Sequence, residues 1–457
     1  MKNNDKLING SLWKNILIFT IPVIFSNLLQ VLFNLSDIAV AGKFSGSIAL
    51  GAVGSTSMLV SLFTGLLMGI GVGINVLVAR YKGAGDINNL RKTTHTGLII
   101  SLLYGIVVMA ISLVLAKPIL VVMNTKDELI NDAVTYIMIY FIGLPALSIY
   151  NYGNGVYSAV GNTKRPLIFI MISGLLNISL NLLFVAVFHL GVKGLAFASI
   201  ISQYILAIVI VLSLKLSKNE CSLKFRELKI DKRSAKDILF IGIPSGFQCA
   251  IFALGNLFVQ SGVNSFDHIM VEGNSAAMNA DTLVYEVMYA FYTACASFVS
   301  QNFGANKKDR VLKSYLISMF YAFSIGAILG LIIFVFDKGF LSIFSSDEEV
   351  IKAGSKRLRV MCVCYCTSAF LDTTTAACRG LGKTLFPTIA VICGACIFRI
   401  IWVYTIFKYL WHTIVGLYIV YIISWGLVCI FEIPYFIYIY KKAFKKSEEI
   451  PTTIDEK

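Results

Sequence analysis

Residues 52–79 read AVGSTSMLVSLFTGLLMGIGVGINVLVA, a run without an Asp, Glu, Lys or Arg. A transmembrane helix needs about 20 mostly apolar residues, so this run is long enough to cross a bilayer. Twelve segments of this kind occur along the chain, at about 14–41, 52–79, 97–117, 133–160, 167–188, 194–214, 238–262, 276–303, 314–336, 358–380, 388–407 and 413–439. The sequence therefore predicts an all-α integral membrane protein with twelve transmembrane helices.

The composition excludes several classes of protein. Hydrophobic residues make up 57% of the chain and charged residues 14%, whereas a typical soluble domain is about 25% charged. A water-soluble enzyme, a disordered chain and a nucleic-acid-binding domain are thereby excluded. The net charge of +14 is explained by cytoplasmic loops rich in Lys and Arg. We expect the lipid bilayer, and no nucleic acid, as a partner.

The basic residues also indicate which loops are cytoplasmic. The longest polar connection, Lys215 to Asp237, holds eight Lys or Arg, and we expect it to be exposed. With an even number of spans, the positive-inside rule predicts that both termini are cytoplasmic. We expect a multi-pass protein of the cell membrane. The basic patch at 352–359 falls on the external side, and we interpret it as the solvated start of a helix.

Two halves of the chain repeat each other at an offset of 221 in the numbering, the repeat offset. Gly83-Ala84-Gly85 recurs as Gly304-Ala305-Asn306, and Gly161-Asn162-Thr163 recurs at Gly382-Lys383-Thr384 with the same offset. The prediction is an N-terminal lobe (1–214), a linker (215–237), a C-terminal lobe (238–440) and a cytoplasmic tail (441–457). Each lobe has six spans, so a pseudo-two-fold axis along the membrane normal relates them, with a cavity between them, as in transporters.

Several motifs in this frame resemble the multidrug and toxic compound extrusion (MATE) family, of prokaryotic type. They are Pro22…Gln30…Asp37…Gly42, Val78-Ala79-Arg80-Tyr81-Lys82-Gly83-Ala84-Gly85, Gly161-Asn162-Thr163, Val299-Ser300-Gln301-Asn302-Phe303-Gly304-Ala305 and Arg379-Gly380-Leu381-Gly382-Lys383-Thr384. The resemblance implies a secondary antiporter that exports organic, cationic and lipophilic compounds in exchange for Na⁺ or H⁺. Two six-helix lobes of that family rock to give alternating access.

An ion-coupling site is expected in the N-terminal lobe. A charge in the hydrocarbon core costs at least about 2.5 kcal/mol, so it is kept only where it faces protein or water. The resemblance makes Asp37 the ion-coupling carboxylate and places Ser199 in the same cluster. Asn177 and Asn181 lie four residues apart, on one helix face. Amide and hydroxyl oxygens beside a carboxylate suit a hard cation, which predicts a Na⁺ site at Asp37, Asn177 and Asn181. The alternative is that the asparagines only join neighbouring helices.

The C-terminal lobe carries a different set of charges, among them Asp281 and Glu432. One family branch has an aspartate where this chain has Asn181, and another uses a glutamate in the seventh span, where this chain has no acid. We expect a substrate site formed by Glu286, Tyr289, Asp372 and Arg399. Tyr285, Tyr289 and Tyr292 form an aromatic stripe that suits a lipophilic cation, although such a stripe is also ordinary packing. Arg399, taken as the one buried arginine, would neutralise Asp372 or Glu286.

Two other functions are weighed against antiport. A lipid-linked flippase of the same superfamily typically has fourteen spans and several basic residues in its cavity. A membrane-embedded enzyme would lean on histidine, yet the four histidines fall at span edges or in loops. We therefore expect no enzyme and no cofactor beyond the coupling ion. The expected partners are small-molecule substrates, and the expected oligomeric state is a monomer.

Overall fold

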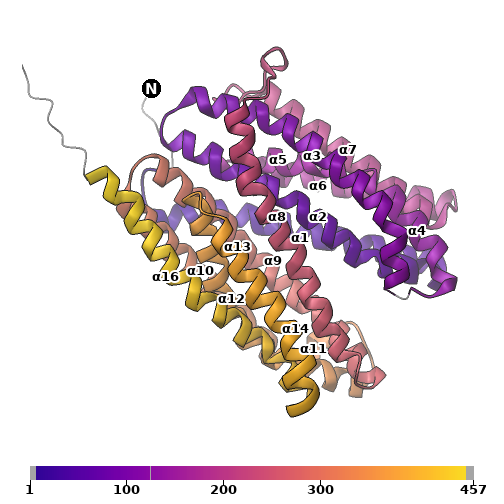
Figure 1. The fold of residues 1–457 in the computed structure, drawn as a ribbon. Coiled ribbons are helices and arrows are strands. Elements are labelled where there is room, and N and C mark those ends of the chain that lie inside the picture. Colours follow the sequence, from indigo (N-terminus) through magenta and orange to yellow (C-terminus); the bar gives the residue numbers. More distant parts are fainter. Residues whose placement is uncertain (1–6, 124, 449–457) are drawn as a thin grey trace, which may run out of the picture. The chain divides into compact units, whose positions relative to one another are not determined.

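The computed structural model describes residues 7–123 and 125–448, and the regular elements of this part of the chain are helices (Figure 1). The first half contains α1 (Leu12–Phe44), α2 (Gly46–Gly83), α3 (Ile87–Val122), α4 (Asp127–Phe141), α5 (Leu144–Ala159), α6 (Lys164–Asn181), the π-helical turn η1 (Leu182–Val187) and α7 (Gly191–Leu216). The short η2 (Phe225–Glu227) follows. The second half contains α8 (Lys232–Val263), α9 (His268–Gly304), α10 (Lys308–Val335), α11 (Asp337–Leu341), α12 (Glu348–Gly380), α13 (Leu385–Val391), η3 (Ile392–Ile397), α14 (Phe398–Trp402), η4 (Val403–Leu410), α15 (Ile414–Tyr418) and α16 (Val420–Glu448).

The prediction of an all-helical membrane protein is confirmed. In the described residues, ten helices are long and apolar enough to cross a membrane. The pair α4 and α5, bent by 46° at its break, makes an eleventh candidate. The remaining predicted segment, 358–380, lies within the 33-residue α12, which is not among the helices that qualify by hydropathy. The predicted tail continues α16 to Glu448, and the rest of it lies outside the described residues.

Contacts divide the described chain into two compact units. Unit 1 contains residues 7–16, 79–85 and 258–448, and unit 2 contains residues 17–78 and 86–257. Most of α8, from its start to Leu257, therefore packs with unit 2, because glycines let α8 approach α2 closely. A Cβ at Gly69 would collide with the backbone of Gly246, and one at Gly246 with that of Leu66. The division into lobes by sequence repeat stays a prediction.

In unit 1, α12 is surrounded by α9, α10 and α16. Neighbouring helices thus cover Arg357, Arg379 and the hydroxyl side chains at 373–375, which are all buried, whereas the charged residues near the start of the helix are exposed. Polar groups inside a membrane protein are tolerated where they face other helices. This position explains how a helix of low hydropathy belongs in a bundle of apolar ones.

The repeat is visible in an irregularity of the helices. The π-helical turn η1 begins at Leu182, and η4 begins at Val403, so the repeat offset separates the two starts. Each follows an α-helical segment at the same position of its half. π-Helical turns in α-helices are rare and frequently lie at functional sites. In the first half, the turn directly follows Asn181, one of the predicted ion-site residues.

The expectation that the linker is exposed throughout is wrong. Cys221 and Leu223 are buried. The Lys224 backbone N–H donates to His95 Nε2 at 3.1 Å, and Thr96 Oγ1 donates to the Lys229 carbonyl at 3.2 Å. The linker is therefore docked on the start of α3, within unit 2. Sequence alone presented it as a basic loop because these anchors are backbone groups.

Cleavage of the linker should still leave the two halves associated. Lys218, Asn219 and Glu220 form an exposed turn before the docked part, so a protease site inserted there should be cut without disturbing the anchors. After cutting, a tag on the N-terminal fragment should purify both fragments together in detergent. Separation of the fragments after cutting would show that chain continuity holds the halves together.

Candidate functional site

Three helices of unit 2 bring four polar side chains together. α1 supplies Asp37, α6 supplies Asn177 and Asn181, and α7 supplies Ser199. Asn181 Nδ2 donates to Asp37 Oδ1 at 2.5 Å, and Ser199 Oγ donates to Asp37 Oδ2 at 3.4 Å. Both carboxylate oxygens therefore have a donor, so that the half-buried carboxylate is held from two sides.

The second asparagine closes the cluster into a ring. Asn177 Nδ2 donates to Ser199 Oγ at 3.4 Å, and its Oδ1 accepts from Asn181 Nδ2 at 3.2 Å. Asn177, Asn181 and Ser199 are each at most 7% exposed. The one-turn spacing on α6 places both amides on the face towards Asp37. The four residues expected at an ion site thus meet, while their role in coupling stays a prediction.

One amide oxygen of the arrangement has no partner among the described residues. Asn181 Oδ1 is enclosed without a hydrogen bond there, whereas its Nδ2 donates twice. A buried acceptor without a donor is costly, which favours occupancy by a cation or a proton-bearing group. Rotation of the Asn181 amide would turn its oxygen towards Asp37, where amide and carboxylate oxygens together suit a hard monovalent cation. Protonation of Asp37 is the other way to neutralise the site.

The aromatic stripe predicted in the C-terminal half is a stacked column on α9. The rings of Tyr285 and Tyr289 lie 6.1 Å apart at 26°, and those of Tyr289 and Tyr292 lie 4.8 Å apart at 9°. Glu286 is half-buried on the same helix. The column ends at Arg379, which hydrogen-bonds the Tyr292 hydroxyl and lies 5.7 Å from the ring centre.

A second acid of the C-terminal half lies close to a hydroxyl of α12. Thr375 Oγ1 donates to Glu432 Oε2 at 2.8 Å, and Glu432 is fully buried on α16. Asp372 lies three residues before Thr375, on the same face of α12. Asp372 Oδ2 and Glu432 Oε1 are both enclosed without a hydrogen-bond partner in the described structure. These two acids are therefore further groups that a proton or cation would stabilise.

Arg399 lies against aromatic residues of α16. Its guanidinium is 4.4 Å from the ring centre of Tyr421 and 5.6 Å from that of Trp425, and its Nε donates to Ser424 Oγ at 3.2 Å. Cation–π contacts of this kind stabilise a desolvated arginine. The pairing of Arg399 with Asp372 or Glu286 stays a prediction.

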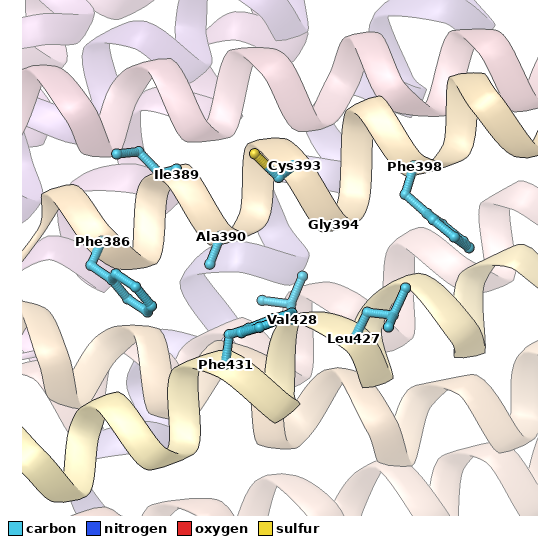
Figure 2. A pocket seen from close by; sticks show the side chains of 9 residues that line it. All are labelled: Phe386, Ile389, Ala390, Cys393, Gly394, Phe398, Leu427, Val428 and Phe431. Atoms are coloured by element: carbon cyan, nitrogen blue, oxygen red, sulfur yellow. The ribbon is translucent and has the colours of Figure 1, made fainter.

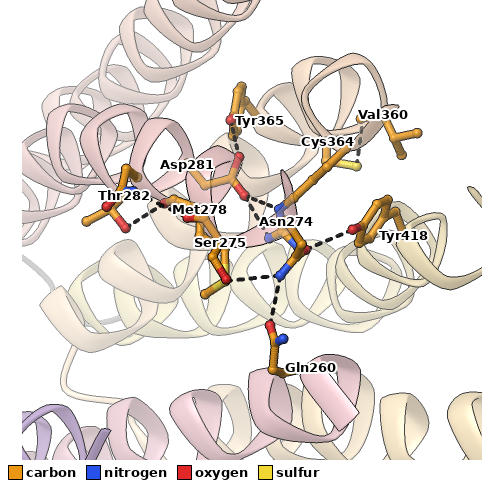
Figure 3. Close-up of polar contacts among 12 residues, drawn as sticks. Gln260, Asn274, Ser275, Met278, Asp281, Thr282, Val360, Cys364, Tyr365 and Tyr418 are labelled. Carbon is orange, nitrogen blue, oxygen red and sulfur yellow. Dashed lines mark hydrogen bonds and ion pairs between the residues drawn. The ribbon is translucent and has the colours of Figure 1, made fainter. Parts of the chain in front are cut away.

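Sequence reasoning missed an ion pair between α9 and α12 (Figure 3). Arg357 Nη2 lies 2.7 Å from Asp281 Oδ2, and the Tyr365 hydroxyl donates to Asp281 Oδ1 at 2.5 Å. Arg357 Nη1 donates to Asn274 Oδ1 at 2.8 Å, and the hydroxyl of Tyr418 donates to the same oxygen. These five residues, the Asp281 network, join α9, α12 and α15. Asn274 Nδ2 extends it to Gln260 near the end of α8.

The interpretation of the basic patch as a solvated helix start is wrong for Arg357, which is 4% exposed. It is right for Arg359, whose side chain is 55% exposed and pairs with Asp337 at 3.1 Å. The expectation that Arg399 is the one buried arginine is also wrong, because Arg357 and Arg379 are buried as well. The signal available in the sequence was a basic patch on the side where the positive-inside rule expects few.

An apolar pocket of about 330 Å³ lies between α13–α14 and α16 (Figure 2). Phe386, Ile389 and Phe431 line it, and a Cβ added at Gly394 would collide with Val428. None of the described residues that line it is Asp, Glu, His, Lys or Arg. The pocket therefore offers apolar contacts only, unlike the clusters of charged residues described above.

Helices long enough to span a membrane, two sequence repeats and ionisable groups enclosed in each half are features of a membrane transporter. The MatE family model matches residues 22–183 and again residues 244–405. The second match begins within one position of the repeat offset from the first, so the family unit itself is present twice. The chain belongs to the MATE family, whose members are transporters and not enzymes.

Individual relatives agree with this assignment. The chain is 27% identical over 397 residues to a protein of Bacillus subtilis called probable multidrug resistance protein YoeA, with 85% of each chain covered. It is 23% identical to the probable multidrug resistance protein NorM of Thermotoga maritima, with 82% of each covered. A solved structure of a multidrug resistance MATE transporter in an outward-facing conformation matches with a TM-score of 0.89 at 23% identity, over 97% of this chain and 99% of that one.

Proposed function

We propose that the protein is a multidrug efflux antiporter, which exports organic, lipophilic cations in exchange for Na⁺ or H⁺ by alternating access. The observation that carries the proposal is the ring of hydrogen bonds that holds the Asp37 carboxylate, in a chain of the MATE family. A carboxylate that holds three helices through its hydrogen bonds changes their packing when it is neutralised. Ion binding would thereby bias the transporter between two conformations.

Na⁺ is slightly favoured over H⁺ as the coupling ion. Asp37, Asn177, Asn181 and Ser199 offer carboxylate, amide and hydroxyl oxygens at one point, and such oxygens are the ligands of hard cations. A proton needs Asp37 alone, so it leaves the two asparagines without a function beyond packing. Replacing Na⁺ by choline at constant pH separates these cases.

The C-terminal half supplies the proposed substrate contacts. The tyrosine column on α9 offers flat faces beside Glu286, and Asp372 adds a second acid on α12. Aromatic faces with nearby carboxylates suit a lipophilic cation. Arg399 is proposed to belong to the same site and to neutralise Asp372 or Glu286. The protein would act as a monomer in the cell membrane, with both termini in the cytoplasm.

A lipid-linked flippase is the second candidate, and three buried arginines of the described chain favour it. Arg357, Arg379 and Arg399 lie in unit 1, and such groups suit a phosphate-bearing substrate. However, Arg357 already pairs with Asp281, and Arg379 and Arg399 stack on aromatic residues. The arginines are therefore engaged within the protein, which supports the antiporter instead.

The antiporter proposal is tested by efflux from proteoliposomes. Liposomes loaded with a fluorescent lipophilic cation should lose it when an inward Na⁺ gradient is imposed, and more slowly when only a H⁺ gradient is imposed. A dye of similar size that carries only negative sulfonate charges should stay inside under both gradients. Gradient-dependent loss of the anionic dye, with the cation retained, would contradict cation export and favour the second candidate.

A further inference from the structure

The last turns of α2 and α9 meet in a reciprocal contact inside unit 1. A Cβ added at Gly83 would collide with the carbonyl oxygen of Gln301, and a Cβ added at Gly304 would collide with that of Arg80. The repeat offset separates Gly83 from Gly304, and it also separates Arg80 from Gln301. The same two positions of each repeat therefore touch the same two positions of the other. Such a self-complementary contact is what a two-fold axis produces.

Both helices also leave the contact in the same way. Gly85 has a φ of +69° and Asn306 has a φ of +53°, and these residues are again equivalent positions of the two repeats. A left-handed residue directly after a helix turns the chain away from its axis. The helix ends are thus shaped to meet at the glycines and then diverge, which makes the contact a local one.

The groups around this contact are polar, and Arg80, Lys307 and Arg310 among them are partly exposed. Arg80 Nη2 donates to the Gly380 carbonyl at 3.3 Å, and its guanidinium lies 5.1 Å from the Phe303 ring centre. Carbonyls of the N-terminal arm, residues 7–10, accept hydrogen bonds from three side chains next to the contact. These are Leu7 from Asn302 at 3.1 Å, Ile8 from Lys307 at 3.0 Å and Gly10 from Arg310 at 3.0 Å. The bonds of Arg80, Lys307 and Arg310 are partly exposed and exchange with water at small net cost, so the contact can open and close again.

We propose that Gly83 and Gly304 are the positioning residues of a gate, which closes the transporter on the side where the N-terminal arm lies. The inference rests on the proposed alternating access, because a cavity between the repeats reaches this side only when their equivalent ends separate. Glycine is required at both positions because the contact is backbone against backbone. The arm is fastened beside the contact and reinforces the closed state.

Alanine at either glycine should push the helix ends apart and favour the open gate. Overpacking a tight contact costs about 1–3 kcal/mol, so amide hydrogen exchange at residues 79–85 and 301–306 should rise about tenfold. We expect this in Gly83→Ala and Gly304→Ala. Gly54→Ala is the matched control. Gly54 also lies on α2, and a Cβ added there would meet no neighbouring side chain or helix within 4 Å. Unchanged exchange in both gate variants, or an equal rise in the control, would overturn the proposal.

A crosslink tests the same gate without changing the glycines. Ala84 and Ala305 directly follow Gly83 and Gly304 and are equivalent positions of the two repeats, so we replace both by cysteine (Ala84→Cys and Ala305→Cys). Cys393→Ser removes the exposed thiol among the described cysteines. Joining the pair with a short bismaleimide should stop efflux, whereas the unjoined protein should transport. Transport at the unjoined rate after joining would overturn the gate. Absence of transport in the unjoined protein would count against the antiporter, and hydrogen exchange would still decide the gate.

Discussion

Asp37→Asn should abolish gradient-driven efflux while leaving the protein folded and able to bind substrate. Asparagine is close in size to aspartate, its one oxygen can accept from Asn181 Nδ2, and its Nδ2 can donate to Ser199 Oγ in place of the bond that Asp37 Oδ2 accepts. The substitution therefore keeps the ring but removes the charge that an ion would neutralise. The site is then permanently in the state that Na⁺ or H⁺ produces. An ion that binds both conformations equally well, or neither, does not change the equilibrium between them. The ion gradient can therefore no longer drive the transport cycle.

The measurement is efflux from proteoliposomes under a Na⁺ and a H⁺ gradient, beside equilibrium binding of the same cation in detergent. We expect efflux at the level of protein-free liposomes and a dissociation constant close to that of the wild type. Asp372→Asn is the comparison variant, and it should weaken binding while part of the ion-dependent change remains. If Asp37→Asn pumps like the wild type under either gradient, coupling resides in Glu286 and Asp372.

The ring around Asp37 was within reach of sequence reasoning because local rules apply to it. Asn177 and Asn181 are one helical turn apart, and a lone aspartate in an apolar span must face protein. Ser199 came from family resemblance rather than from spacing. What the sequence could not supply is the direction of the Asn181 amide, whose nitrogen faces the carboxylate. That orientation depends on three helices packed together.

The Asp281 network was out of reach for a related reason. Asp281 and Arg357 are 76 residues apart, and no periodic pattern connects them. Arg357 stands among Lys352, Lys356 and Arg359, so its neighbours made it look like part of a solvated surface. Only the packing of α12 among α9, α10 and α16 buries it. Long-range pairing decided its environment, whereas the sequence offered only local composition.

The sequence repeat gives this network a natural comparison. Shifted by the repeat offset, Asp281 corresponds to Val60 and Arg357 to Tyr136, while Asn274 and Tyr365 correspond to Val53 and Leu144. Those four residues belong to, or pack against, the apolar core of unit 2. The chain therefore fills equivalent places of its two halves once with apolar side chains and once with an ion pair. Packing alone can evidently hold such a place together.

Removing one partner of the buried pair should be far more damaging than replacing both. Arg357→Tyr leaves Asp281 enclosed with one hydroxyl donor, and Asp281→Val leaves the Arg357 guanidinium without its carboxylate. Each should destabilise the protein by about 3–5 kcal/mol, because an uncompensated charge remains buried. The double variant Asp281→Val/Arg357→Tyr, which installs the residues of the other repeat, should recover most of that loss.

Thermal and denaturant unfolding of the purified protein in detergent measures this cycle of variants. The pair of Arg359 and Asp337 is the internal control, since the Arg359 side chain is 55% exposed. Asp337 is buried, but it also accepts hydrogen bonds from the Ser355 hydroxyl and the Lys338 backbone N–H, so it keeps two donors when Arg359 is replaced. Arg359→Tyr should therefore change the unfolding midpoint little, although it lies on the same helix two residues after Arg357. Additive losses in the double variant would mean that the two charges do not stabilise each other. The hydroxyls of Tyr365 and Tyr418 and the amide of Asn274 would then hold the helices in place, with the ion pair as a bystander.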